Sequence, residues 1–158
     1  MRLFLFLILL LFSNLLKAKS IQCKFEEVYQ DGSLQFGQVL FHEGLLRYQY
    51  NDEQLFTIIF NEDYFAIRND KPEIVNKLEK NILLNELTYV LSNYPNIEKN
   101  YLSNEIRISI ESSHKDNFLK RISIISSDAN LSIYFIDCQN KELSKKYFQP
   151  FSLISISQ

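Results

Sequence analysis

The sequence predicts a mainly β domain in which a strongly bent antiparallel sheet carries one helical insertion. Two patterns indicate this. Runs of five to ten residues alternate between apolar and polar side chains and are separated by turns of two to four residues. Between Pro72 and Tyr94 the apolar spacing changes to three and four residues. Glycine and proline occur three times each, and no repeat or low-complexity linker divides the 158 residues, so we expect a single domain.

Residues 1–18 are interpreted as a secretory signal peptide. Arg2 precedes ten apolar residues, Leu3 to Phe12, and small residues near Ala18–Ser20 suit a signal peptidase. The apolar run is shorter than the roughly 20 residues of a membrane-spanning helix. We therefore expect an exported domain over residues 19–158.

Two cysteines, Cys23 and Cys138, lie near the two ends of this domain. A lipid anchor on Cys23 needs a small residue before it, and Gln22 stands there, so we expect a soluble exported protein. An oxidising compartment allows the two cysteines to pair. The alternative is two buried free thiols that pack as small apolar side chains.

The net charge excludes one class of partner. Removing Arg2 and Lys17 with the signal leaves 15 basic and 19 acidic residues, a net charge of −4. The basic residues are also scattered along the chain. Nucleic-acid binding requires a clustered basic face, so no nucleic-acid partner is expected.

The first half of the domain predicts an antiparallel meander. Asp31-Gly32 and Glu43-Gly44 have the composition of hairpin turns, and Gly37 is expected to mark a bulge or bend. The run around Phe56 to Phe60 is apolar on both faces, so both faces need cover. The expected strands are residues 21–30, 33–42, 45–51, 54–61 and 64–69.

The second half begins with one or two amphipathic helices between Pro72 and Tyr94, which Pro95 ends because the residue before proline disfavours the helical conformation. Strands then resume. In the first of them Ile106, Ile108 and Ile110 alternate with polar residues, which indicates one wet face. The expected strands are residues 105–112, 118–127, 130–138 and 148–157.

Nine Tyr and, once the signal is removed, ten Phe give the domain a large aromatic content. Two architectures would accommodate it. One is a β-sandwich or a filled small barrel, whose interior is side chains. The other is a bent sheet that keeps an apolar hollow, partly plugged by the helices, for a lipid-like ligand. The candidate lining residues are Leu46, Tyr48, Tyr50, Phe56, Ile58, Phe60, Ile82, Leu83, Leu87 and Leu91.

No pattern in the sequence indicates catalysis. His42 follows an apolar run and His114 lies in a polar turn, and neither has further ligands at the spacing of a metal site. The sequence contains no nucleophile elbow, phosphate-binding loop or glycine-rich dinucleotide turn. We therefore expect a protein that is not an enzyme and needs neither metal nor cofactor.

The order of several residues resembles the periplasmic outer-membrane lipoprotein carrier family, LolA. In that family an aromatic near a glutamine is followed by a turn, a glycine-led strand, and then a glycine, an apolar pair, an arginine and two aromatics. Its closing run has an asparagine, a leucine, a phenylalanine and a proline. The residues that match are Phe25, Gln30, Gly37, Gly44, Leu46, Arg47, Tyr48, Tyr50, Asn140, Leu143, Phe148 and Pro150.

This resemblance implies an incomplete, unclosed β-barrel covered by a helical lid. It also implies a periplasmic carrier that takes lipoproteins from an inner-membrane ABC exporter and passes their acyl chains to an outer-membrane acceptor. An arginine that helps to hold the family's lid is replaced here by His42, so His42 and Arg47 are the candidate gate residues.

Two alternatives belong to other classes. One is a sensor or adaptor domain on the same fold that binds a protein partner or another lipid. The other is an outer-membrane acceptor anchored through Cys23. Recovery of a stoichiometric protein partner without lipid favours the adaptor, and a lipidated N-terminus favours the acceptor.

Overall fold

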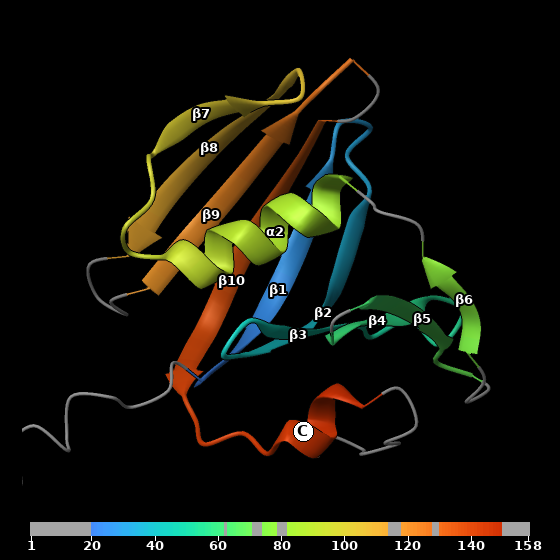
Figure 1. Cartoon of the computed structure of the whole chain (residues 1–158). Coiled ribbons are helices and arrows are strands. Elements are labelled where there is room, and N and C mark those ends of the chain that lie inside the picture. The colour runs from blue at the N-terminus through green and yellow to red at the C-terminus, as the bar shows by residue number, and fades with distance from the viewer. Residues whose placement is uncertain are drawn as a thin grey trace, which may run out of the picture.

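One antiparallel sheet of ten strands forms the body of the molecule, in the order β6-β5-β4-β3-β2-β1-β10-β9-β8-β7 (Figure 1). The structure is a computed structural model that describes residues 20–61, 63–70, 74–78, 82–113, 118–127 and 130–149. The edge strands β6 and β7 do not pair with each other, so the sheet is not closed. This order confirms the mainly β prediction. It excludes the sandwich and the closed barrel for the described residues, because all their strands belong to one open sheet.

The first five strands form a meander of neighbouring hairpins, as predicted. Strands β2 and β3 are joined by Glu43-Gly44, both at positive φ of 50° and 87°, which is the conformation of a tight hairpin turn. These strands are β1 (Ser20–Tyr29), β2 (Leu34–His42), β3 (Leu45–Tyr50), β4 (Phe56–Asn61) and β5 (Asp63–Arg68).

Of the bulge or bend expected at Gly37, the bulge is wrong. The pairing of β2 with β1 and with β3 runs through Gly37 without a change of register. A Cβ at this position would lie 2.1 Å from the carbonyl oxygen of Gln49 and 2.4 Å from the Cζ of Phe25. Glycine is needed because the ring of Phe25 occupies the space of the missing side chain.

The helical prediction for residues 72–94 is right only in its second half. Residues Ile74–Leu78 form strand β6, which pairs with β5, and a single helix, α2, spans Ile82–Asn93. The spacing of Ile74, Val75 and Leu78 suits a helix, but the unpaired edge of β5 offers backbone hydrogen bonds to an extended segment. The helix ends directly before Tyr94-Pro95, as predicted.

The last four strands continue the sheet on the other side of β1. Because β10 pairs with β1, the first and last strands of the described chain are neighbours in the middle of the sheet. Strand β7 falls in a stretch where no strand was predicted. The strands are β7 (Asn100–Ser103), β8 (Ile106–Ser113), β9 (Phe118–Ile125) and β10 (Asn130–Asn140).

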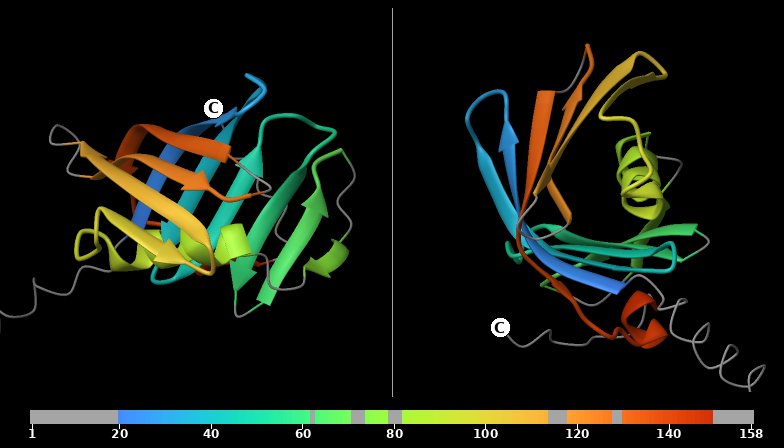
Figure 2. Two further views of the ribbon diagram at one scale, coloured as in Figure 1. Left: turned by 90° about the horizontal axis from the view of Figure 1, so that it is seen from above. Right: turned by 90° about the vertical axis from the view of Figure 1, so that its left-hand side faces the viewer.

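The two faces of the curved sheet carry different covers. The right-hand view of Figure 2 shows α2 inside the curve, whereas the short helix η1 (Lys145–Phe148) lies outside it, under β3 and β4. We call the inner side the concave face and the outer side the convex face. The covers explain why β4 is apolar on both sides, since Ile58 packs on the concave face and Ile59 is completely buried on the convex face.

The predicted last strand, residues 148–157, is wrong at its start. Phe148 ends η1 rather than beginning a strand, and it is fully buried against Leu40 and Leu143 on the convex face. Residues 150–157 of that prediction lie outside the described residues.

Candidate functional site

The concave face and α2 enclose one continuous apolar cluster. Strand β1 contributes Cys23 and Phe25, and the strands on either side contribute residues that alternate in the same register. From the helix, Leu87, Val90 and Leu91 enter the same cluster, with exposed fractions of 3%, 0% and 1%. The helix therefore buries its apolar face against the inside of the curved sheet.

Most of the candidate lining residues come together in this cluster. Phe56 differs, because its side chain is 38% exposed, and the side chain of Ile82 lies outside the described part of the structure. The candidates that the cluster unites are Leu46, Tyr48, Tyr50, Ile58, Phe60, Leu83, Leu87 and Leu91.

Four of these residues, Leu46, Tyr48, Leu87 and Leu91, are fully packed, and the other four are partly buried. Leu46 is 0% exposed and Tyr48 is 2% exposed, values typical of a filled core. Two pockets that are lined wholly by described residues lie elsewhere, and neither is lined by a candidate residue. Leu46, Tyr48, Leu87 and Leu91 thus belong to a packed core that α2 covers.

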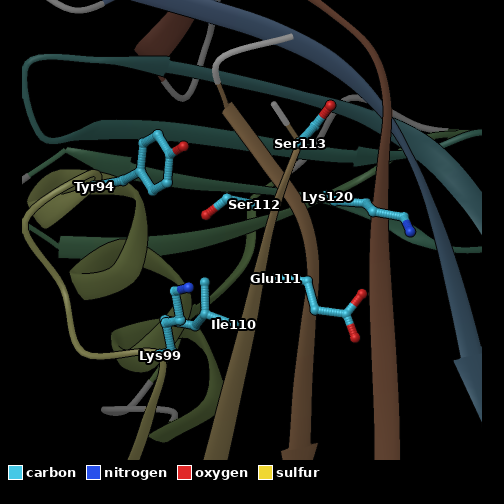
Figure 3. Close-up of a pocket in the computed structure, with 7 residues that line it drawn as sticks. All are labelled: Tyr94, Lys99, Ile110, Glu111, Ser112, Ser113 and Lys120. Carbon is cyan, nitrogen blue, oxygen red and sulfur yellow. The ribbon is translucent and has the colours of Figure 1, made fainter. Parts of the chain in front are cut away.

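The larger of these two pockets has a volume of about 510 Å³ and lies where β8 and β9 approach the end of α2 (Figure 3). Its walls are mixed, since Tyr94 and Ile110 also pack in or on the apolar cluster while Lys99, Glu111 and Lys120 carry charges. Glu111 forms an ion pair with Arg121. The pocket is open and its walls are mixed, so it does not resemble an acyl-chain site, which is lined by apolar side chains.

A buried carboxylate, Glu27, lies at one end of the concave face. The residue is 3% exposed, and its two oxygens accept hydrogen bonds from three tyrosine hydroxyls. Tyr29 donates to Oε2 at 2.6 Å, while Tyr48 and Tyr50 donate to Oε1 at 2.8 and 3.2 Å. The hydroxyls replace the water that a carboxylate loses on burial.

The three tyrosines remain neutral hydrogen-bond donors. Burial raises the pKa of Tyr48 and Tyr50, and the nearby negative charge of Glu27 raises it further because a second anion is disfavoured there. Burial followed by the hydrogen bond to Glu27 raises the pKa of Tyr29. Each hydroxyl therefore keeps the proton that it donates.

The aromatic rings around Glu27 also contact one another. Phe25 stacks on Tyr48 with a centroid distance of 4.0 Å, and Tyr50 meets Phe25 edge-on at 5.5 Å and Tyr48 at 5.6 Å. The close approach of Phe25 to Gly37 makes room for this arrangement. We call Phe25, Glu27, Tyr29, Tyr48 and Tyr50 the Glu27 cluster.

The Glu27 cluster was not predicted as a site. Its sequence signal is that Glu27 follows Cys23 and Phe25 at a spacing of two, so a strand places the carboxylate on the apolar face. The pairing of β1 with β2 and β3 was needed to show that tyrosines from β3 reach it. The hydrogen bonds of Tyr48 and Tyr50 to Glu27 join residues that are 21 and 23 positions apart in the sequence.

Helix α2 is attached to the sheet by side chains. Among the described strands, none approaches the backbone of α2 as extensively as β3 and β4 approach that of η1. Glu86 of α2 accepts hydrogen bonds from Tyr101 at 3.0 Å and from Ser103 at 2.5 Å, both on the edge strand β7. Apart from these bonds, the contacts described above between α2 and the sheet are apolar.

The two candidate gate residues lie on the convex face, away from α2. Arg47 is 6% exposed, and its Nη1 donates to the carbonyl oxygen of Tyr147 at 3.2 Å. His42 stacks on Phe148 and shares a hydrogen bond with Ser20. Strand alternation explains this placement, because Arg47 must face away from its neighbours Leu46 and Tyr48. In this structure both residues hold the C-terminal segment rather than the helix.

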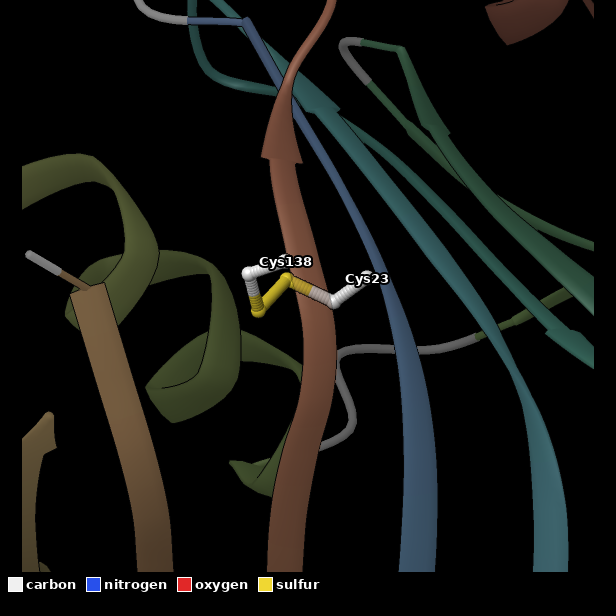
Figure 4. Close-up of a disulfide and its surroundings, with 2 residues drawn as sticks. All are labelled: Cys23 and Cys138. Atoms are coloured by element: carbon white, nitrogen blue, oxygen red, sulfur yellow. A yellow bond between two sulfur atoms is a disulfide. The ribbon is translucent and has the colours of Figure 1, made fainter. Parts of the chain in front are cut away.

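Cys23 and Cys138 form a disulfide between the neighbouring strands β1 and β10 (Figure 4). The pairing of these strands shifts so that Asp137 and Cys138 together lie opposite Cys23, and Asp137 has a positive φ of 55°. This bulge brings the two cysteine Cα atoms to 4.1 Å. Of the two alternatives left open by the sequence, the structure contains the disulfide.

Two further observations concern the described residues alone. They contain no group of three or more His, Cys, Asp or Glu side chains arranged to hold a metal ion. No helix among them is long and apolar enough to span a membrane.

No protein-family model matches the chain, and no curated protein matches it either. The resemblance to the lipoprotein carriers therefore depends on the order of residues described above.

Proposed function

We propose that the protein is a periplasmic carrier that binds the acyl chains of lipoproteins between the concave face and α2. The observation that carries this proposal is that an open, curved sheet has its apolar inner face covered by one helix attached through side chains. The helix is the proposed lid. In the function that the resemblance implies, an inner-membrane ABC exporter loads the carrier and an outer-membrane acceptor unloads it.

The energies of opening and binding are of similar size. Opening the lid exposes Leu87, Val90, Leu91 and the partly buried Leu83. At roughly 1.5 to 3 kcal/mol for each side chain, this costs roughly 6 to 12 kcal/mol. Burial of one acyl chain contributes about 0.8 kcal/mol per CH₂, or on the order of 10 kcal/mol for a long chain. Because the cost of opening the lid nearly equals the gain from burying the acyl chain, the net affinity is modest, as a carrier that releases its cargo requires.

The edge of the lid that lies beside β7 is the proposed hinge. Glu86 holds that edge through Tyr101 and Ser103, whereas Leu87 and Leu91 reach the sheet through apolar contacts only. Apolar contacts are not directional, so acyl chains can replace them with little loss. The helix can then turn away from β3 and β4 while it stays attached to β7.

Lipid binding by the exported protein tests this proposal. The protein is purified from the periplasm, examined by native mass spectrometry and titrated with a fluorescent fatty acid. We expect bound acyl lipid, and we expect Leu87→Glu to abolish binding because it places a charge on the buried face of the lid. Leu102→Glu is the matched control, since Leu102 is 71% exposed on β7.

Circular dichroism of each variant checks that it folds. If Leu87→Glu does not fold, Leu91→Ala is the milder substitution on the same face of the lid. An unliganded mass together with no binding of the fatty acid contradicts the carrier proposal. Recovery of one stoichiometric protein partner without lipid would instead support the adaptor function. The convex face offers a surface for such a partner, because Leu34 and Phe36 are each 46% exposed there.

A further inference from the structure

The buried charge of Glu27 has no cationic partner within the described part of the chain. Ion pairs there join other residues, and none includes Glu27. Fully buried carboxylates are rare in proteins unless a cation or a metal ion accompanies them. The three hydroxyls satisfy hydrogen bonds but carry no positive charge.

One acceptor position of the carboxylate remains open. An ionised carboxylate has about four lone-pair positions. Two hydroxyls use those of Oε1, and Tyr29 alone uses Oε2. Tyr29, which donates to Oε2, ends β1 and is only half-buried.

The surrounding rings suit a cation that is poorly hydrated. The electron-rich faces of tyrosine and phenylalanine attract ammonium groups, above all when the site is shielded from water. In the Glu27 cluster, Tyr29 and Tyr50 come from the ends of β1 and β3 and are both partly buried. Their rings form the least buried part of the cluster.

From these contacts we propose that the Glu27 cluster binds the alkylammonium group of an acyl lipid, with Glu27 as the counter-ion. This inference rests on the proposed carrier function and narrows its cargo to lipids with a positively charged amine. The chain of such a lipid would lie along the apolar cluster, which includes Phe25 and Tyr48. The chemistry fits either the free α-amine of a lipoprotein or the ammonium headgroup of a phospholipid.

Surfactants that share one chain but differ in headgroup test the proposal. Binding of dodecyltrimethylammonium, dodecyl maltoside and dodecyl sulfate is measured directly by isothermal titration calorimetry, below their micelle concentrations. We expect the ammonium compound to bind about tenfold more tightly than the maltoside, as cation–π and charge contacts in a shielded site imply.

Glu27→Gln keeps the shape of the side chain and removes its charge. We expect this variant to lose the preference for ammonium while its affinity for the maltoside stays within about twofold. Glu26→Gln is the matched control, because Glu26 is the neighbouring residue of β1 and faces the convex side. Tyr29→Leu, at the half-buried end of the cluster, should weaken ammonium binding severalfold and keeps the test valid if Glu27→Gln does not fold.

The outcomes separate this inference from the carrier proposal. Equal affinities for the ammonium compound and the maltoside, or a preference that survives in Glu27→Gln, overturn the inference and leave the carrier intact. If the ammonium compound binds in a way that depends on Glu27, but neither the maltoside nor the fatty acid binds, the carrier proposal is wrong and the ammonium site at Glu27 is supported. A diacylated lipopeptide and a lysophospholipid, each compared with its N-acetylated form, then show which source of amine is bound.

Discussion

Removal of the disulfide by the double change Cys23→Ala and Cys138→Ala should strongly destabilise the domain. The bond joins β1 to β10 across a sequence separation of 115 residues, so it closes almost the whole described chain into one loop. In the chain-entropy model a loop of this length contributes about 5 kcal/mol, because it restricts the unfolded state. Native domains are stable by only about 5 to 15 kcal/mol, so the loss is a large share of the total.

Urea unfolding, followed by circular dichroism, measures this effect. We expect the free energy of unfolding to fall by about 5 kcal/mol and the melting temperature by roughly 15 to 25 °C. Wild-type protein unfolded with and without reductant is the control, since reduction should reproduce the loss without changing a side chain. A loss below about 1 kcal/mol would refute the reasoning, because the loop between β1 and β10 would then not constrain the unfolded chain.

Two further predictions concern the space at Gly37 and the tyrosines that donate to Glu27 and Glu86. Gly37→Ala should lower the free energy of unfolding by roughly 1 to 3 kcal/mol, because the new Cβ overlaps the Gln49 carbonyl and the ring of Phe25; unchanged urea unfolding and near-ultraviolet circular dichroism would contradict this. Alkaline titration, followed by tyrosinate absorbance, should show four of the nine tyrosines ionising last or only on unfolding, since their pKa values are raised. The folded state holds these protons more tightly than the unfolded chain, so their contribution is complete below about pH 10 and stability falls as the pH rises above it. The four tyrosines with raised pKa values are Tyr29, Tyr48, Tyr50 and Tyr101. If all nine tyrosines ionise together near pH 10 in the folded protein, that prediction is wrong.

Local patterns in the sequence determined most of the strands and the side chains that share a face. Alternation along β3 placed Leu46 and Tyr48 together, and the hairpin residues Glu43-Gly44 fixed the register of β2 and β3. The three-and-four spacing in α2 placed Leu87 and Leu91 on its buried face. These features follow from the geometry of single strands and helices, so they need no knowledge of distant contacts.

Contacts between distant segments decided the rest. Residues 74–78 became a strand because β5 has an edge to pair with, and no local pattern carries that information. The C-terminal segment covers the convex face, so Arg47 contacts Tyr147 rather than the lid. Phe148 is buried there for the same reason.

The Glu27 cluster shows most clearly what only the tertiary structure determined. The sequence placed Glu27 on the apolar face of a strand, where an isolated carboxylate would be strongly disfavoured. The tyrosines that stabilise it come from β1 and β3, and they meet Glu27 because β2 brings those strands to one curved surface and Gly37 leaves space for the Phe25 ring. Hydrogen bonds depend on positions in space, so a site assembled from separate strands is visible only after the sheet has formed.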